Sequence, residues 1–179
     1  MNQKFTAFLF GLLGTTLLIC SCILALYFRQ SSQQAALYSQ LAASASHFDT
    51  GELTGEGSLL PEREELYEQN PDMVGWIQIE GTSIDYPVMQ TVDKPNFYLK
   101  RGFDKQYSDY GVPYVQENCD LALSDNCVIY GHHMNNGTMF ADLCKYESKD
   151  FYREHKIIRF DTLSGFGEYE ICLLYTSPS

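Results

Sequence analysis

The stretch "NPDMVGWIQIEGTSIDYPVMQ", Asn70 to Gln90, decides the fold class of this 179-residue chain. Apolar residues alternate with polar ones in "GWIQIEG", "GTS" supplies turn residues, and "IDYPVMQ" is a second apolar run. Two short apolar runs joined by a turn predict a pair of β-strands. From Met73 onward we therefore expect a mainly β structure.

Short runs of the same kind continue toward the C-terminal end. They are "NFYLK", "VPYVQ", "CVIYG", "KIIRF" and "GEYEICLLY", with Gly, Asn, Asp and Pro between them. Short strands with such joints are typical of a β-barrel or sandwich. One interruption, Gly137 to His155, has apolar residues at helical spacing and predicts a short helix, with a second from Lys149 to Glu154.

The N-terminal segment is apolar. Phe5 to Phe28 form 24 positions without a charge, between Lys4 and Arg29. About 20 apolar residues cross a bilayer as a helix, whereas the apolar core of a cleaved signal peptide, the alternative, has only about 7–15 residues. We expect residues 1–29 to form a cytoplasmic tail and a single-pass transmembrane anchor. A short tail inside and the large domain outside the cell is the simpler orientation, although the Lys and Arg bias that sets it is slight.

The rest of the chain divides into a linker and a domain. Residues 30–58 are polar, small and glycine-bearing, which is typical of a stalk. Pro61, ahead of the acidic run 62–69, predicts a helix that opens a domain over residues 59–171. The whole chain holds 12 basic and 23 acidic residues and no basic run, so we expect no nucleic-acid partner.

The six cysteines are too widely spaced for a small disulfide scaffold. Cys20 and Cys22 fall in the apolar anchor. Outside the membrane, a bridge between Cys119 and Cys127 is one interpretation, and buried free thiols are the other.

Adjacent histidines, His132 and His133, follow the apolar run "CVIYG". Neighbouring side chains of an extended chain point in different directions, so the two imidazoles are poorly placed to bind the same metal ion. No His-x-x-x-His or Cys-x-x-Cys pattern supplies further ligands, and we expect no metal and no cofactor. Two interpretations of this pair remain. The histidines are loop residues without a special role, or one of them is a general acid or base.

Four motifs together resemble the class B sortases of Gram-positive bacteria, which are cysteine transpeptidases. They are "NPDMVGWIQIEGTSIDYPVMQ" (70–90), "NFYLKRGFD" (96–104), "NCVIYGHHMNNGTMFADLCKY" (126–146) and "DFYREHKIIRFDT" (150–162), in the family's order. The resemblance implies a sortase-type β-barrel with short helices behind one N-terminal transmembrane helix. It also implies cleavage of a C-terminal sorting signal of surface proteins. The acyl group would then pass to an amine of a peptidoglycan precursor or a pilin.

The resemblance gives the two histidines different roles. The family's catalytic His follows Gly in "YGH", which is His132 here, and His133 falls at a variable position. The family's nucleophile lies in a later "TLxTC" motif, with an arginine beyond it, and this sequence has no "TLxTC". We therefore expect the chain as written to be inactive.

Each cysteine near the motifs is unsuited to be that nucleophile. Cys119 and Cys127 precede His132, against the family's order, and Cys127 begins an apolar run and is expected in the core. Cys144 lies on the apolar stripe of the predicted helix, and Cys172 comes too soon after the histidine.

The ending "CLLYTSPS", residues 172–179, resembles the translation of a sequencing-library adapter. We expect this tail to be non-native and residues 59–171 to be the N-terminal part of a catalytic domain with an incomplete barrel. A natural frameshift or a degenerate copy is the alternative origin. The alternative functions are a non-catalytic, membrane-tethered extracellular β-domain that binds peptide or cell wall, and a metal-dependent hydrolase using His132, His133 and Asp142.

Overall fold

The computed structural model describes residues 3–45, 61–163 and 165–172. It comprises two compact units, Met1–Leu37 and Tyr38–Ser179. Of the expected stalk, residues 30–45 belong to a helix and residues 46–58 lie outside the described residues, as do residues 173–179 of the expected tail.

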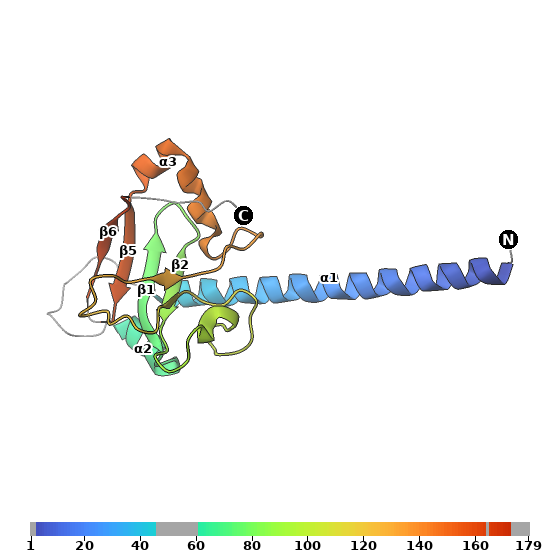
Figure 1. Ribbon diagram of the computed structural model, residues 1–179, viewed down its shortest axis with the longest axis horizontal. Helices are drawn as coiled ribbons and strands as arrows, with labels where there is room; N and C mark the ends of the chain where they lie inside the picture. The colour runs from blue at the N-terminus through green and yellow to red at the C-terminus, as the bar shows by residue number, and fades with distance from the viewer. Residues whose placement is uncertain (1–2, 46–60, 164, 173–179) are drawn as a thin grey trace. The chain divides into compact units, whose positions relative to one another are not determined.

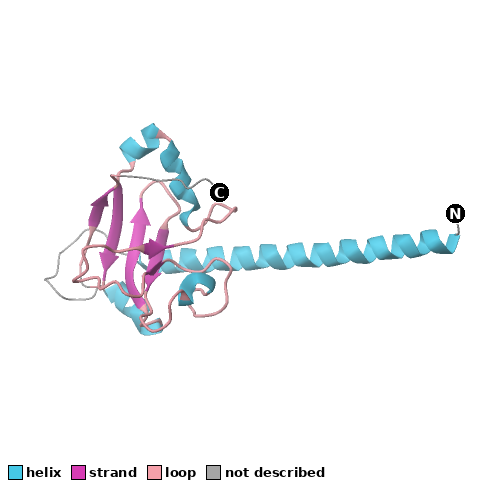
Figure 2. Ribbon diagram, in the orientation of Figure 1, coloured by secondary structure: helices cyan, strands magenta, loops and turns pink. Residues whose placement is uncertain are grey.

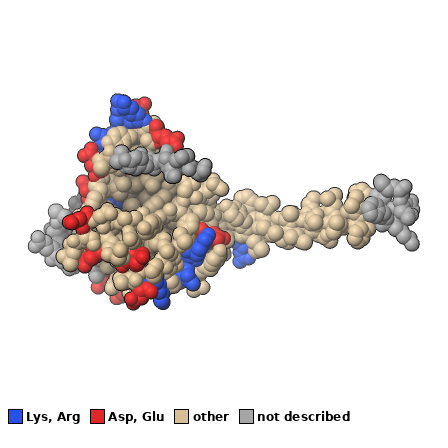
Figure 3. Space-filling model, viewed as in Figure 1, with Lys and Arg blue, Asp and Glu red and all other residues tan. Residues whose placement is uncertain are grey.

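Helix α1 runs from Gln3 to Ala45. Its segment Phe8–Ala43 contains an 18-residue window with a mean hydropathy of 2.3, and the helix is long and apolar enough to cross a membrane, by length and composition. Figure 3 shows this segment almost free of charged side chains, whereas acidic groups are spread over the visible face of the β unit. The helix is a candidate anchor, as the uncharged run from Phe5 to Phe28 predicts.

The second unit is built on one sheet of six strands in the order β4-β3-β2-β1-β5-β6 (Figures 1 and 2). The strands are β1 Met73–Ile79, β2 Asp85–Met89, β3 Tyr114–Val115, β4 Ile129–Tyr130, β5 Ile157–Thr162 and β6 Glu168–Glu170. Among the described residues β4 and β6 are the outer strands and do not pair with each other. The prediction of a mainly β fold with an incomplete barrel is confirmed.

Strand β1 lies at the centre of this sheet. It pairs antiparallel with β2 and with β5, so that Ile77 stands opposite Tyr86 on one side and Phe160 on the other. Trp76 and Ile77 point to opposite faces, as neighbours on a strand do, yet they are only 4% and 6% exposed. The strand that alternates most clearly in the sequence is therefore covered on both faces.

A tight turn at Gly81 joins β1 to β2. Gly81 has a φ of 75°, in the left-handed region that favours glycine. The Ile79 N–H donates to the carbonyl of Ile84 at 3.0 Å and closes the turn. "GTS" thus forms the predicted connection between the two strands.

Four helical segments flank the sheet. They are α2 Pro61–Gln69, η1 Phe97–Lys100, η2 Phe140–Glu147 and α3 Lys149–Glu154, of which η1 and η2 are 3-10 helices. Figure 1 shows α2 and α3 at opposite ends of the sheet. The predictions of α2, of a helix after Gly137 and of α3 are confirmed.

The prediction of a strand at "NFYLK" is wrong. Asn96, directly after Pro95, adopts a φ of 57° and reverses the chain. The Phe97 N–H then donates to Lys94 and the Leu99 N–H to Asn96, which makes η1. A left-handed Asn is a turn signal, and here it outweighs the β propensity of Phe and Tyr.

A buried amide joins α2 to η1. The Asn70 side chain, 1% exposed, donates to the Tyr98 hydroxyl at 2.9 Å and to the Phe103 carbonyl at 2.6 Å. Its oxygen accepts from the Asp72 N–H at 3.1 Å. Because each polar atom has a partner, this amide is buried without the cost of an unmade hydrogen bond.

A second link connects α2 to β5. Arg63 donates to the Asp161 carboxylate at 2.8 Å, and the two side chains are only 10% and 16% exposed. We expect Arg63→Ala to lower the free energy of unfolding by about 3 kcal/mol, because it leaves a largely buried carboxylate unpaired. The change in the free energy of unfolding is measured by thermal and denaturant unfolding of the full chain in detergent, followed by near-UV circular dichroism.

Arg153→Ala is the matched control. It breaks the pair with Asp150, whose side chain is 86% exposed, and should cost less than about 0.5 kcal/mol. Equal losses in the two variants would show that the buried pair does not stabilise the fold.

Candidate active site

The two histidines lie at the base of a closed loop between β4 and η2. The His132 carbonyl accepts from the Phe140 N–H at 2.9 Å, and His133 forms an antiparallel bridge with Met139. The loop is thus a hairpin whose ends are fixed. The stretch that the sequence presents as "GHHMNNGTMF" is held in one conformation at the point where the histidines emerge.

Two residues explain why this loop takes its path. A Cβ on Gly131 would lie 2.5 Å from the Phe140 ring, so only glycine permits this close approach. Met139 is 1% exposed, has a φ of 57°, and donates its N–H to the Tyr86 hydroxyl of β2 at 3.1 Å. Burial of Met139 therefore compensates for an unfavourable backbone angle and attaches the end of the loop to the sheet.

His132 is half-buried beside two opposite charges. Burial of the imidazole and the positive charge of Lys100 lower the pKa of His132, while the Asp109 carboxylate acts in the opposite direction. Lys100 and Asp109 pair with each other at 3.1 Å, so their effects on the ring partly cancel. The imidazole is therefore mainly neutral near pH 7, the form that can accept a proton.

His133 is exposed and contacts a thiol. Its Nε2 lies 3.5 Å from the Sγ of Cys144, and Cys144 is exposed too. In the described part of the chain this thiol–imidazole contact is made by His133, not by the neighbouring His132. The structure thus separates the two histidines that the sequence leaves side by side.

The prediction that Cys144 lies on an apolar stripe is wrong. The segment forms the 3-10 helix η2, which has three residues per turn. Its apolar side chains are therefore three apart, at Phe140, Leu143 and Tyr146, and Cys144 is turned away from them toward solvent.

The prediction that Cys127 lies in the core is also wrong. Cys127 leads into β4, an outer strand, and is exposed. The apolar face that it shares with Ile129 borders an open pocket, so no packed layer covers it.

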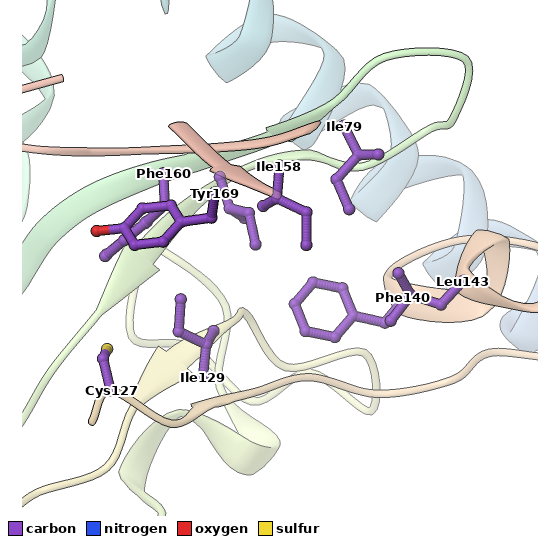
Figure 4. A pocket seen from close by; sticks show the side chains of 9 residues that line it. Ile79, Cys127, Ile129, Phe140, Leu143, Ile158, Phe160 and Tyr169 are labelled. Carbon is purple, nitrogen blue, oxygen red and sulfur yellow. The ribbon is translucent and has the colours of Figure 1, made fainter. Parts of the chain in front are cut away.

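This pocket has a volume of about 320 Å³ and lies between the sheet and η2 (Figure 4). Phe140 and Leu143 point from η2 toward Ile158 on the sheet, and Cys127 and Ile129 form the lower wall in the view. Its lining side chains are Ile77, Ile79, Cys127, Ile129, Phe140, Leu143, Ile158, Phe160 and Tyr169. Among the described residues the lining carries no charge, which suits an apolar ligand.

Two properties of the site bear on chemistry. The pocket lining does not include His132, although Phe140, whose N–H holds the His132 carbonyl, belongs to it. No group of three or more His, Cys, Asp or Glu side chains over residues 3–45, 61–163 and 165–172 is arranged to hold a metal ion.

Known proteins resemble this chain in sequence and in fold, although no family model matches it. The sortase B of Staphylococcus aureus is 39% identical over 113 residues, which are 62% of this chain and 45% of that protein. The sortase B of Listeria monocytogenes is 38% identical over 116 residues, 64% of this chain and 46% of that protein. A solved structure described as a Staphylococcus aureus sortase B–substrate complex superimposes with a TM-score of 0.68 at 31% identity, covering 79% of this chain and 64% of that one.

These likenesses support the class of protein that the motifs indicate, a class B sortase. Both curated relatives and the solved structure are sortase B proteins, and the matched part of this chain is similar to them in sequence and in fold. It spans less than half the length of the two curated relatives.

The charges around His132 generate a prediction for its titration. We expect a pKa below the ordinary value of 6.5, a further decrease in Asp109→Asn, and an increase in Lys100→Gln, because each change removes one of the two opposing charges. NMR titration of the imidazole resonances in the full chain measures all three, with His133→Gln used to assign the signals. An Asp109→Asn variant with an unchanged or higher pKa would contradict this account.

The same shift has a consequence for stability. Because the pKa of folded His132 is lowered, the unfolded chain binds this proton more readily. The stabilisation from neutral His132 is therefore complete above about pH 6.5 and is lost as the pH falls from there through the folded-state pKa. Unfolding measured across this range in wild type and His132→Gln should show a smaller pH dependence in the variant.

Proposed function

We propose that this protein is a membrane-anchored cysteine transpeptidase of the sortase type. It cleaves a C-terminal sorting signal of surface proteins and joins the acyl group to an amine of a peptidoglycan precursor or a pilin. The observation that carries the proposal is the class B similarity together with His132 of "YGH" at the end of β4, half-buried in a fixed loop.

His132 would act first as a base and then as an acid. The nucleophile of a cysteine enzyme is the thiolate, and a neutral imidazole can take up the thiol proton. The imidazolium then protonates the leaving amine as the acyl–enzyme forms. The Asp109 carboxylate, whose charge raises the pKa of His132, would stabilise that imidazolium.

The nucleophile is a separate part of the proposal. No cysteine in these 179 residues stands in the family's Thr-Leu-x-Thr-Cys setting, and we propose that this chain alone is inactive. Cys144 contacts His133 instead of His132. Cys119 and Cys127 precede the histidine and lie in the connection between β3 and β4.

The proposed partners are a sorting-signal peptide, the acceptor amine and the membrane. An extended peptide with apolar side chains matches the uncharged pocket between the sheet and η2, and the S. aureus sortase B has been solved as a substrate complex. Helix α1 has the length and composition of an anchor. We propose a single-pass protein of the cell membrane with its catalytic domain outside.

The first experiment reads the source DNA from codon 120 onward. We expect a reading frame that continues past Ile171 into a Thr-x-Thr-Cys motif with an arginine beyond it. A stop codon directly after Ser179 in the genome would overturn the transpeptidase proposal. It would favour the alternative, a tethered extracellular β-domain that binds peptide or cell wall without turnover.

Activity of the protein encoded by that frame tests the role of His132. With fluorogenic sorting-signal peptides, His132→Ala should lower kcat/KM by about 100- to 10,000-fold, the range for loss of a general acid or base. His133→Ala is the matched control and should stay close to wild type. Comparable losses in both variants would contradict the separate roles of the two histidines.

A further inference from the structure

We propose that Cys119 and Cys127 form a disulfide that closes the connection between β3 and β4, directly before the strand that leads to His132. The inference rests on the proposed placement of the domain outside the membrane, where thiols meet oxidising conditions. It assigns a covalent modification to two residues that have no part in the proposed catalysis.

The strands on either side bring the two ends of this connection together. Val115 of β3 pairs antiparallel with Ile129 of β4, and the next hydrogen bond runs from the Gln116 N–H to the Val128 carbonyl at 3.0 Å. Cys119 follows this last bond by three residues, and Cys127 precedes Val128. The ladder therefore holds both cysteines at the mouth of one hairpin loop.

The Cys119 side is fixed by hydrogen bonds. Its N–H donates to the Gln116 carbonyl at 3.1 Å, and its own carbonyl accepts from the Gln90 side chain at 2.6 Å. The Cys119 thiol lies 3.6 Å from the carbonyl of Asn126, the residue before Cys127. The thiol thus points across the loop, and the side chains of Cys119 and Cys127 are within hydrogen-bonding reach of each other.

The turn between the two cysteines is already formed. The Asp120 N–H donates to the Ser124 hydroxyl at 2.9 Å, and the Ser124 N–H donates back to the Asp120 carbonyl at 2.8 Å. The Asp120 carboxylate accepts from the Ala122 N–H at 2.9 Å. A disulfide needs two cysteines brought close without backbone movement, and these bonds hold the backbone there.

The protonation of Cys127 reflects how close the two thiols lie. Although the residue as a whole is exposed, partial burial of its thiol and the neighbouring Cys119 raise the pKa of Cys127 to about 11. Cys127 therefore stays protonated near neutral pH until it reacts.

The oxidant is a small-molecule or protein disulfide. One cysteine of the pair, as the thiolate, attacks one of its sulfurs, forming a mixed disulfide and releasing one thiol. The other cysteine then loses its proton and attacks the sulfur of the first cysteine, releasing the second thiol. Two electrons pass to the oxidant, and the protons of the two cysteines end on its two thiols.

Redox titration of the full chain in detergent tests the pair. The protein is equilibrated with mixtures of reduced and oxidised glutathione, free thiols are alkylated, and the peptides are mapped by mass spectrometry. We expect a peptide pair linked through Cys119 and Cys127, about 2 Da lighter than the reduced form, and a melting temperature raised by about 5 °C.

Three variants test which cysteines form the cross-link. Cys119→Ser and Cys127→Ser should each abolish the cross-link and leave the other cysteine open to alkylation, whereas Cys144→Ser, which removes another exposed thiol, should leave it intact. Alkylation of Cys119 and Cys127 to the same extent as Cys144 in every glutathione mixture would overturn the proposal. A cross-link that persists in Cys127→Ser through a different cysteine would overturn it as well.

This titration is independent of catalysis. Because it reads mass and melting temperature and needs no turnover, a failure to form the bridge leaves the transpeptidase proposal standing. Conversely, if the protein encoded by the complete reading frame formed the bridge but showed no turnover, only the proposed function would be refuted.

Discussion

The fold depends on β1 being paired on both edges and covered on both faces. Ile77 stands between Tyr86 and Phe160 in the sheet, so neither edge of the strand is free to pair elsewhere. A shift of one residue would exchange the buried faces of Trp76 and Ile77, and the hydrogen bond from the Trp76 indole to Asp85 at 2.6 Å opposes that shift. The other strands of the sheet are positioned relative to β1, either by pairing with it or through a neighbouring strand.

The position of the candidate site depends on that sheet indirectly. β4, which leads to His132, reaches the centre of the sheet only through β3 and β2. The far end of its loop is attached to β2 directly, since buried Met139 donates to the Tyr86 hydroxyl. His132 is therefore held from both ends, as the proposed role of general base and acid requires.

The errors of sequence-based prediction have specific physical causes. "NFYLK" has strand-forming residues, but the left-handed Asn96 before it starts a 3-10 helix. Apolar residues three or four positions apart are compatible with both an α-helix and a 3-10 helix. The α-helical interpretation places Cys144 on the apolar stripe, whereas the 3-10 helix places its side chain on a different side. Cys127 has an apolar neighbourhood in the sequence, yet lies at an outer strand beside an open pocket.

The sequence by itself determined the local structure, the family and the candidate histidine. Alternation and turn residues specify β1 and β2, Pro61 opens α2, and "YGH" singles out His132, because these signals depend only on neighbouring residues. Only the tertiary structure decided which groups meet: Lys100 and Asp109 at His132, Cys144 at His133, and Cys119 at Cys127. Most of these pairs combine residues from different elements, and spacing along the chain does not encode such contacts until the strands have paired.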